Sequence, residues 1–158
     1  MPRLARLVKS RYAESAFDGE GARHFGGRWN SLGQPVVYAA DSIALAALEL
    51  LVHLGSEQIL SSYTLFQWNL ADEQVMALDT QSLPDDWTRE PAVPSTARIG
   101  DEWLDSGLSV ALRVPSVIVP EESNYLLNPR YPDFHQALDD LRRRPFGFDP
   151  RLERPGEP

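Results

Sequence analysis

Glu49 is the side chain whose position in this sequence points most directly to chemistry. It lies in a run from Ile43 to Leu54 that is otherwise apolar, with His53 as the second polar interruption four residues later. A carboxylate among aliphatic neighbours loses solvation, so it needs a partner or a role that uses its charge. Two interpretations stay open: a buried ion pair or hydrogen bond, to His53 or to an arginine of a glycine-rich segment, and a functional carboxylate.

The glycine-rich segment in question is Gly26-Gly27-Arg28-Trp29-Asn30-Ser31. Paired glycines let the backbone approach a partner closely, and the Arg28 guanidinium is a planar, permanently charged fork suited to phosphate or carboxylate. The pyrophosphate of a dinucleotide would suit this fork. The segment lacks the spacing and the following helix of the Rossmann glycine fingerprint, and a plain turn with a surface arginine is the alternative.

Four polar residues could complete such a site. Tyr38, near the end of an apolar run, could stack on a planar ligand or belong to the core with its hydroxyl bonded to the backbone. Ser116 has no glycine elbow and no recognisable His/Asp pair, so we expect a hydrogen-bonding group rather than a nucleophile. Asn124 and Asn128 flank a short segment that could shape a loop at the pocket or merely satisfy turns.

Other catalytic classes find little support. The chain contains no cysteine, which excludes disulfides, thiolate nucleophiles and iron–sulfur clusters. Its histidines, His24, His53 and His135, lack a trustworthy metal-ligand spacing with carboxylates. We therefore expect no catalytic metal.

The elements that must position these residues follow from periodicity and turn signals. The helix with Glu49 is predicted over Ile43–Leu54, capped by Ser42, stopped by Gly55 and apolar nearly all round, which is typical of a buried helix. Two more helices are predicted over 95–105, ending at Gly107, and over 133–143. Strands are predicted at 4–8, 35–39, 63–70, 75–78, 109–114 and 116–119, with loops over 18–27 and 79–94.

Chain length, hydrophobic patterning and charge predict the domain organisation, the location and the kind of partner. The 158 residues predict one domain over 1–158, with a loosely held tail from about 150. No secretory signal follows the basic start, and no segment could cross a bilayer, so we expect a soluble cytoplasmic protein. A net charge of −8 argues against nucleic-acid binding and suits a basic partner; the basic run 142–144 is interpreted as the solvated end of a helix.

Taken together, motifs in the same order along nearly the whole chain resemble the RES domain, which is named for an arginine, a glutamate and a serine. By this resemblance the three map onto Arg28, Glu49 and Ser116, with Arg6 as a second candidate for the arginine. The quoted motifs are Gly19-Glu20-Gly21-Ala22, Gly26-Gly27-Arg28-Trp29-Asn30, Val36-Val37-Tyr38-Ala39-Ala40, Ala46-Ala47-Leu48-Glu49, Leu51-Val52-His53, Val114-Pro115-Ser116, Asn124-Tyr125-Leu126-Leu127-Asn128-Pro129 and Pro145-Phe146-Gly147-Phe148-Asp149-Pro150-Arg151-Leu152.

The resemblance implies a mixed α+β fold like that of ADP-ribosyltransferases, with a split β-sheet core and flanking helices. It also implies a bacterial toxin that depletes NAD and pairs with an Xre-type helix-turn-helix antitoxin, and it is compatible with a homodimer inside the toxin–antitoxin complex. Such an antitoxin would be the DNA-binding component, and its charge would suit the acidic chain.

The residues support a mechanism for that activity. Nicotinamide leaves NAD as a neutral group, so cleavage needs stabilisation of the positive charge on the ribose, as in glycoside hydrolysis. We expect Glu49 to supply that charge, Arg28 or Arg6 to hold the pyrophosphate or ribose, Tyr38 to stack on the nicotinamide side, and Ser116 and Asn124 to position ribose or amide groups. The acceptor stays open between water, phosphate and a protein side chain. The alternatives are a protein ADP-ribosyltransferase and a non-catalytic binding module with a buried Glu49–Arg28 pair.

Overall fold

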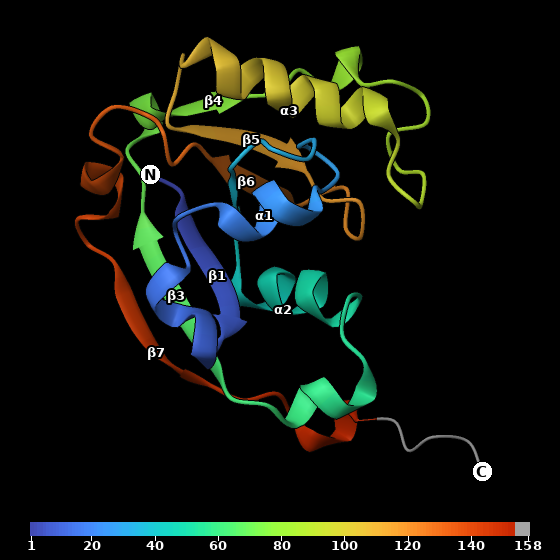
Figure 1. Cartoon of the computed structure of the whole chain (residues 1–158), viewed down its shortest axis with the longest axis vertical. Coiled ribbons are helices and arrows are strands. Elements are labelled where there is room, and N and C mark those ends of the chain that lie inside the picture. The colour runs from blue at the N-terminus through green and yellow to red at the C-terminus, as the bar shows by residue number, and fades with distance from the viewer. Residues whose placement is uncertain (154–158) are drawn as a thin grey trace.

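A seven-stranded mixed sheet forms the centre of the molecule. The computed structural model describes residues 1–153, apart from the side chains of residues 56 and 57, so residues 154–158 of the predicted tail lie outside the described part. The strands lie in the order β4-β5-β6-β2-β1-β3-β7 (Figure 1). Their bounds are β1 Arg3–Lys9, β2 Val37–Ala40, β3 Tyr63–Asn69, β4 Val75–Ala77, β5 Ala111–Pro115, β6 Ser123–Leu127 and β7 Arg142–Phe146.

The sheet is split between β1 and β2. These strands pair through one register position, Ala5 opposite Ala40, whereas β1 pairs with β3 along its full length. One half therefore contains β4, β5, β6 and β2, and the other contains β1, β3 and β7. Every neighbouring pair is antiparallel except β4 with β5. The predicted mixed α+β class with a split sheet and flanking helices is confirmed.

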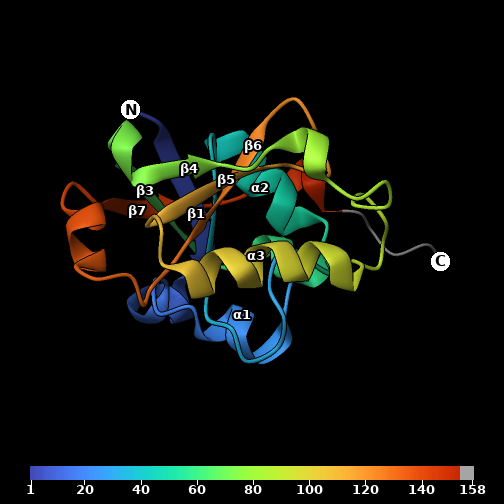
Figure 2. The same ribbon diagram turned by 90° about the horizontal axis from the view of Figure 1, so that it is seen from above.

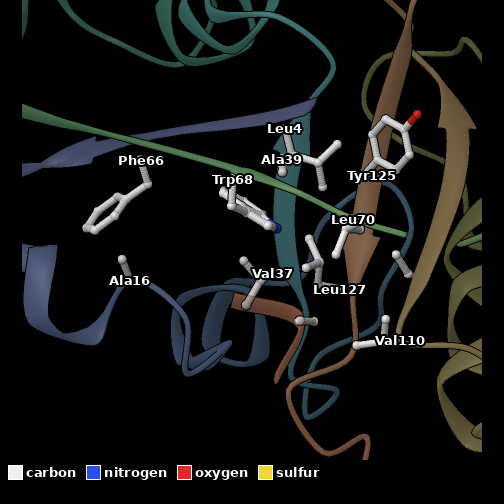
Figure 3. Close-up of a cluster of buried hydrophobic side chains, with 12 residues drawn as sticks. Leu4, Ala16, Val37, Ala39, Phe66, Trp68, Leu70, Val110, Tyr125 and Leu127 are labelled. Carbon is white, nitrogen blue, oxygen red and sulfur yellow. The ribbon is translucent and has the colours of Figure 1, made fainter. Parts of the chain in front are cut away.

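The alternation of side chains along β2 separates the two faces of the sheet. Val37 and Ala39 point into one buried cluster, where Trp68 and Phe66 of β3 also lie (Figure 3). Tyr38 and Ala40 point to the opposite face, because successive side chains of a strand alternate. Helix α2, Ile43–Leu51, which carries Glu49, packs on this second face.

Two longer helices cover the second face, and a short helix lies beside them (Figures 1 and 2). Helix α2, Ile43–Leu51, packs on β1 and β2, and α3, Pro94–Ser106, places Trp103 and Leu104 against Leu112 and Leu126 of the sheet. The short helix is α1, Glu20–Phe25. Short 3₁₀ segments occupy Ser10–Ser15, Ser56–Leu60, Asp72–Gln74, Thr80–Ser82, Phe134–Leu138 and Pro150–Leu152.

Helix α2 begins as predicted but is less buried than predicted. The Ser42 hydroxyl accepts a hydrogen bond from the Leu45 backbone N–H at 3.0 Å, which satisfies an N-terminal donor. The helix ends at Leu51 rather than Leu54, and the side chains of Leu48 and Val52 are 41% and 60% exposed. The prediction of a helix buried on all sides is therefore wrong, since one apolar side faces outward.

Several other boundaries differ from the predictions. The predicted loop over 18–27 contains α1, and residues 116–119 form bends rather than a strand. The segment after 123, expected as a loop, is β6. The helix predicted over 133–143 is instead a 3₁₀ segment followed by β7, because residues 142–146 pair with the free edge of β3 and that pairing outweighs helix propensity.

The remaining predictions agree with the structure. The strands near 4–8, 35–39, 63–70, 75–78 and 109–114 are present, as are the helix ending at Gly107 and the long connection over 79–94, which includes one 3₁₀ turn. The basic run 142–144 is exposed as predicted, although on an edge strand. Within residues 1–153, no helix has both the length and the apolar character needed to traverse a lipid bilayer.

Candidate functional site

Glu49 lies near the end of α2 with its carboxylate asymmetrically bonded. Its Oε1 atom accepts hydrogen bonds from the Ser116 hydroxyl at 2.8 Å and from the Asn124 amide at 2.6 Å. In the described part of the chain, Glu49 forms no ion pair and its Oε2 atom has no hydrogen-bond donor. The side chain is half-buried. One oxygen is thus fixed by the protein, while the other forms no hydrogen bond within the described residues.

The Ser116 hydroxyl forms three hydrogen bonds within the protein. It donates to Glu49 and accepts from the backbone N–H groups of Ile118 and Val119, both at 3.1 Å. These local bonds turn the chain immediately after β5, which explains why residues 116–119 do not continue as a strand. Ser116 is completely buried, and its single hydroxyl proton is engaged by the Glu49 carboxylate, which fits the hydrogen-bonding role expected from the sequence.

Sheet register brings Asn124 to Glu49 and places Tyr38 nearby. Asn124 in β6 lies opposite Ala40 in β2, so the two share a face of the sheet. Tyr38 lies on that same face two residues before Ala40, which corresponds to about 7 Å along the strand. Leu126 lies directly opposite Tyr38, so Tyr38 and Asn124 are diagonal neighbours on this face.

The Tyr38 hydroxyl is bonded inside the protein. It donates to Asn30 Oδ1 at 2.6 Å and accepts from the Trp29 backbone N–H at 3.3 Å. Burial raises the pKa of Tyr38, with the bond from Trp29 acting against that effect, so the hydroxyl stays protonated as a donor at neutral pH. The hydrogen-bonded hydroxyl expected of a core tyrosine is present, and the ring is the part of Tyr38 left to contact a ligand.

Arg28 projects from the glycine-rich segment toward the loop before α3. Its Nη1 atom donates to the carbonyl oxygens of Trp87 and Arg89, each at 2.9 Å, and Nη2 pairs with the Glu90 carboxylate. The Arg28 side chain is 14% exposed, whereas that of Glu90 is 73% exposed. Arg28 therefore has an exposed carboxylate partner that an incoming anion could replace.

Neither of the charged partners considered for Glu49, Arg28 and His53, forms an ion pair with it in the described part of the chain. Arg28 pairs with Glu90, and His53 is exposed beyond the end of α2. Glu49 is bonded by two neutral donors, a hydroxyl and an amide. The interpretation of Glu49 as one half of a Glu49–Arg28 pair is wrong, because the arginine lies among the carbonyls of another loop.

Arg6 lies at the split in the sheet and serves the backbone. On β1 it alternates with Ala5 and Leu7, which belong to the cluster beneath α2, so its side chain leaves the strand on the other side. Its Nε atom donates to Ala16 O at 2.8 Å and its Nη1 atom to Tyr38 O at 2.7 Å. Burial lowers the pKa of Arg6 to about 10, against the raising effect of Asp18. It remains charged at neutral pH, and no bond among residues 1–153 joins it to Glu49.

The geometry thus unites four of the six candidates around one face of the sheet: Glu49, Ser116 and Asn124 in direct contact, and Tyr38 beside them. Comparison with family models decides what kind of domain this is, because the RES domain model matches residues 3–149. The chain belongs to the RES domain family.

Relatives of this RES domain extend over nearly its whole length. It is 44% identical over 149 residues to "Toxin Res" of Photorhabdus laumondii, covering 94% of this chain and 96% of that protein. It is 39% identical over 146 residues to "Prs ADP-ribosylating toxin" of a Sphingobium species, covering 90% of each. Its fold is similar to a chain in the M. tuberculosis MbcT-MbcA toxin-antitoxin complex, with a TM-score of 0.72, 22% identity and coverage of 96% and 86%.

Two residues that contact the candidates are not predicted from the sequence. Asn30, which accepts from Tyr38, has no predicted role, and the segment with Glu90, which meets Arg28, is predicted only as a loop. The clustering of aromatic and polar residues after Gly27 was the available signal for Asn30. Within the described residues, no group of three or more His, Asp or Glu side chains could hold a metal ion.

Proposed function

We propose that this RES domain is a toxin that cleaves the nicotinamide–ribose bond of NAD. The observation that carries the proposal is the state of Glu49: Oε1 is immobilised by Ser116 and Asn124, while Oε2 is unbonded in the described part of the chain. A half-buried carboxylate held in this way is preorganised to face developing positive charge and needs little rearrangement during the reaction.

The chemistry required of the protein is electrostatic. When the glycosidic bond of NAD breaks, its electron pair leaves with the nicotinamide nitrogen, which becomes neutral, and the ribosyl carbon gains positive character. Glu49 would stabilise that charge and orient the ribose hydroxyls through Oε2. Water or phosphate would then form the new bond to the ribosyl carbon, with water losing a proton to solvent.

The other site residues would bind and orient the substrate. Arg28 would exchange its Glu90 contact for the pyrophosphate or a ribose, because a guanidinium prefers a bidentate phosphate contact. The Tyr38 ring would stack against the nicotinamide side, while Ser116 and Asn124 keep the carboxylate in place. Arg6 would support the strand split that lies behind Tyr38 rather than touch the substrate.

An antitoxin is the partner that this proposal requires. The structural neighbour is a toxin in a toxin-antitoxin complex, and the net charge of −8 suits a basic surface on a partner. We propose an Xre-type helix-turn-helix protein in that role, acting in the cytoplasm, with the complex able to contain two copies of the toxin. Size-exclusion chromatography with light scattering on the co-expressed pair would measure that stoichiometry.

Replacing Glu49 by glutamine tests the proposal. The variant keeps an oxygen that can accept from Ser116 and Asn124, so it should fold and bind NAD, while nicotinamide release falls about 10²- to 10³-fold. Release is measured by chromatography of NAD incubated with the purified protein. Glu102→Gln, the same change at an exposed position of α3, is the matched control and should retain full activity. A wild-type rate of nicotinamide release by Glu49→Gln would show that Glu49 is not the catalytic carboxylate.

A second candidate function is transfer of ADP-ribose to a protein. It is favoured by the similarity to a relative named as an ADP-ribosylating toxin, since the same bond breaks in both reactions. Mass spectrometry of cellular proteins after induction separates the two. One discrete protein carrying ADP-ribose would favour transfer, whereas a fall in total NAD without a modified protein would favour hydrolysis or phosphorolysis.

A further inference from the structure

Asn30 is the most heavily bonded buried side chain in the glycine-rich segment. It is 1% exposed, and its amide nitrogen donates to the carbonyl oxygens of Ala22, Ser31 and Gln34 at 2.8, 3.3 and 3.1 Å. Its Oδ1 atom accepts from the Tyr38 hydroxyl at 2.6 Å. One side chain thus ties helix α1, the following loop and strand β2 together.

The backbone of the same residue closes the turn that presents Arg28. Gly27 N donates to Asn30 O at 3.0 Å, and Asn30 N donates back to Gly27 O at 3.4 Å. Arg28 and Trp29 therefore form the tip of a tight turn whose base is Asn30. Because a small movement of the backbone displaces the end of a long arginine side chain, the position of the Arg28 guanidinium depends on Asn30.

The turn is also connected to Tyr38 through a short chain of hydrogen bonds. The Trp29 N–H donates to the Tyr38 hydroxyl, and that hydroxyl donates to Asn30 Oδ1. A Cβ atom at Gly27 would lie 2.7 Å from the Tyr38 hydroxyl oxygen and 2.8 Å from Asn30 Oδ1. Glycine at this position is thus required by the closeness of the Tyr38–Asn30 pair, which shows how tightly the turn is fitted to it.

We propose that Asn30 is a positioning residue for substrate binding, which holds the Arg28 turn and the Tyr38 ring in one fixed relation. The inference rests on the proposed function, because it assigns Arg28 and Tyr38 to the NAD site. Asn30 touches no substrate itself. It acts on affinity through the two residues that do, so it should affect the binding of NAD more than the cleavage step.

The test measures NAD affinity by calorimetry in the Glu49→Gln background, where the substrate persists. Asn30→Ala should weaken NAD binding about tenfold when Arg28 is present. In combination with Arg28→Ala it should add less than about twofold, because two changes that act through one contact are not additive. With Glu49 intact, the KM for NAD should rise while kcat changes little.

Two further variants keep the result interpretable. Asn128→Ala alters another buried asparagine, 3% exposed and bonded to Leu104 O, outside the site; it should cost stability but leave NAD affinity unchanged. If Asn30→Ala does not fold, Tyr38→Phe keeps the ring, removes the hydroxyl contacts to Asn30 and to the Trp29 N–H, and should reproduce the rise in KM. Amide hydrogen exchange at Trp29 should accelerate in both Asn30→Ala and Tyr38→Phe.

The outcomes separate the inference from the function on which it rests. Faster exchange at Trp29 with unchanged NAD affinity, or full additivity of Asn30→Ala with Arg28→Ala, would overturn the positioning role while wild-type nicotinamide release upholds the proposed function. An unmodified wild-type protein that neither binds NAD nor releases nicotinamide would remove the proposed function, and the role of Asn30 with it.

Discussion

Replacing Asn124 by aspartate changes the charge at the contact that immobilises Glu49 while preserving its shape. The amide nitrogen of Asn124 lies 2.6 Å from Glu49 Oε1 and donates a hydrogen bond to it. An aspartate there would bring a second carboxylate to the same oxygen, and two carboxylates in contact repel each other. Turnover that depends on the position of the Glu49 carboxylate should then fall.

The size of the effect follows from Coulomb's law. Two unit charges about 4 Å apart repel by about 1 kcal/mol in a water-like medium and about 4 kcal/mol at an effective dielectric constant of about 20. Since 1.36 kcal/mol corresponds to about a tenfold change in rate, turnover should fall about 5- to 10³-fold. Glu49 is half-buried, so solvent screening favours the lower part of that range.

The assay is the initial rate of nicotinamide release at saturating NAD and constant neutral pH. Asn124→Ala is the matched control, because it removes the same hydrogen bond without adding a charge; it should be slower than wild type but faster than Asn124→Asp. Equal rates for Asn124→Asp and Asn124→Ala would refute the reasoning.

Two further predictions concern Arg28 and its turn. Glu90→Gln should lower the KM for NAD about two- to fivefold, measured by steady-state kinetics, because the exposed ion pair that competes for Arg28 contributes at most about 1 kcal/mol; an unchanged KM would mean that Arg28 keeps this contact when NAD binds. Gly100→Ala should lower the free energy of unfolding by about 1–3 kcal/mol in urea denaturation and raise the KM for NAD, because overpacking at a fixed backbone is destabilising. The added Cβ would lie 1.6 Å from Trp29 O and push the turn away from α3. Wild-type stability together with a wild-type KM would contradict the packing argument.

Residues with strong local signals were predicted well. Ser42 begins α2 and Gly107 ends α3, because capping depends on groups within a few residues of the helix end. The strand over 63–70 follows from its alternation, and the carboxylate of Glu49 stands out by composition alone. The resemblance to RES domains supplied the split sheet, which no local pattern in the sequence could predict.

The errors fall where tertiary contacts outweigh local preference. The basic run 142–144 is predicted as the end of a helix, but residues 142–146 pair with the open edge of β3 and form β7. The asparagines at 124 and 128 favour a loop or turns, yet residues 124–127 pair with β2 and β5 on either side and belong to β6. Helix α2 was expected to be buried all round, and only the packing of its neighbours decides that Leu48 and Val52 remain exposed.

The sequence by itself determined the helix that carries Glu49, the strand that carries Tyr38, the turn glycines around Arg28 and membership of a family with a split sheet. Only the tertiary structure decided which groups meet. Ser116 and Asn124 reach Glu49 across 67 and 75 residues of chain, and Arg28 finds its carbonyl partners 59 and 61 residues away. Capping and periodicity act over one or two helical turns, whereas these contacts depend on sheet register and loop path, which the whole chain fixes together.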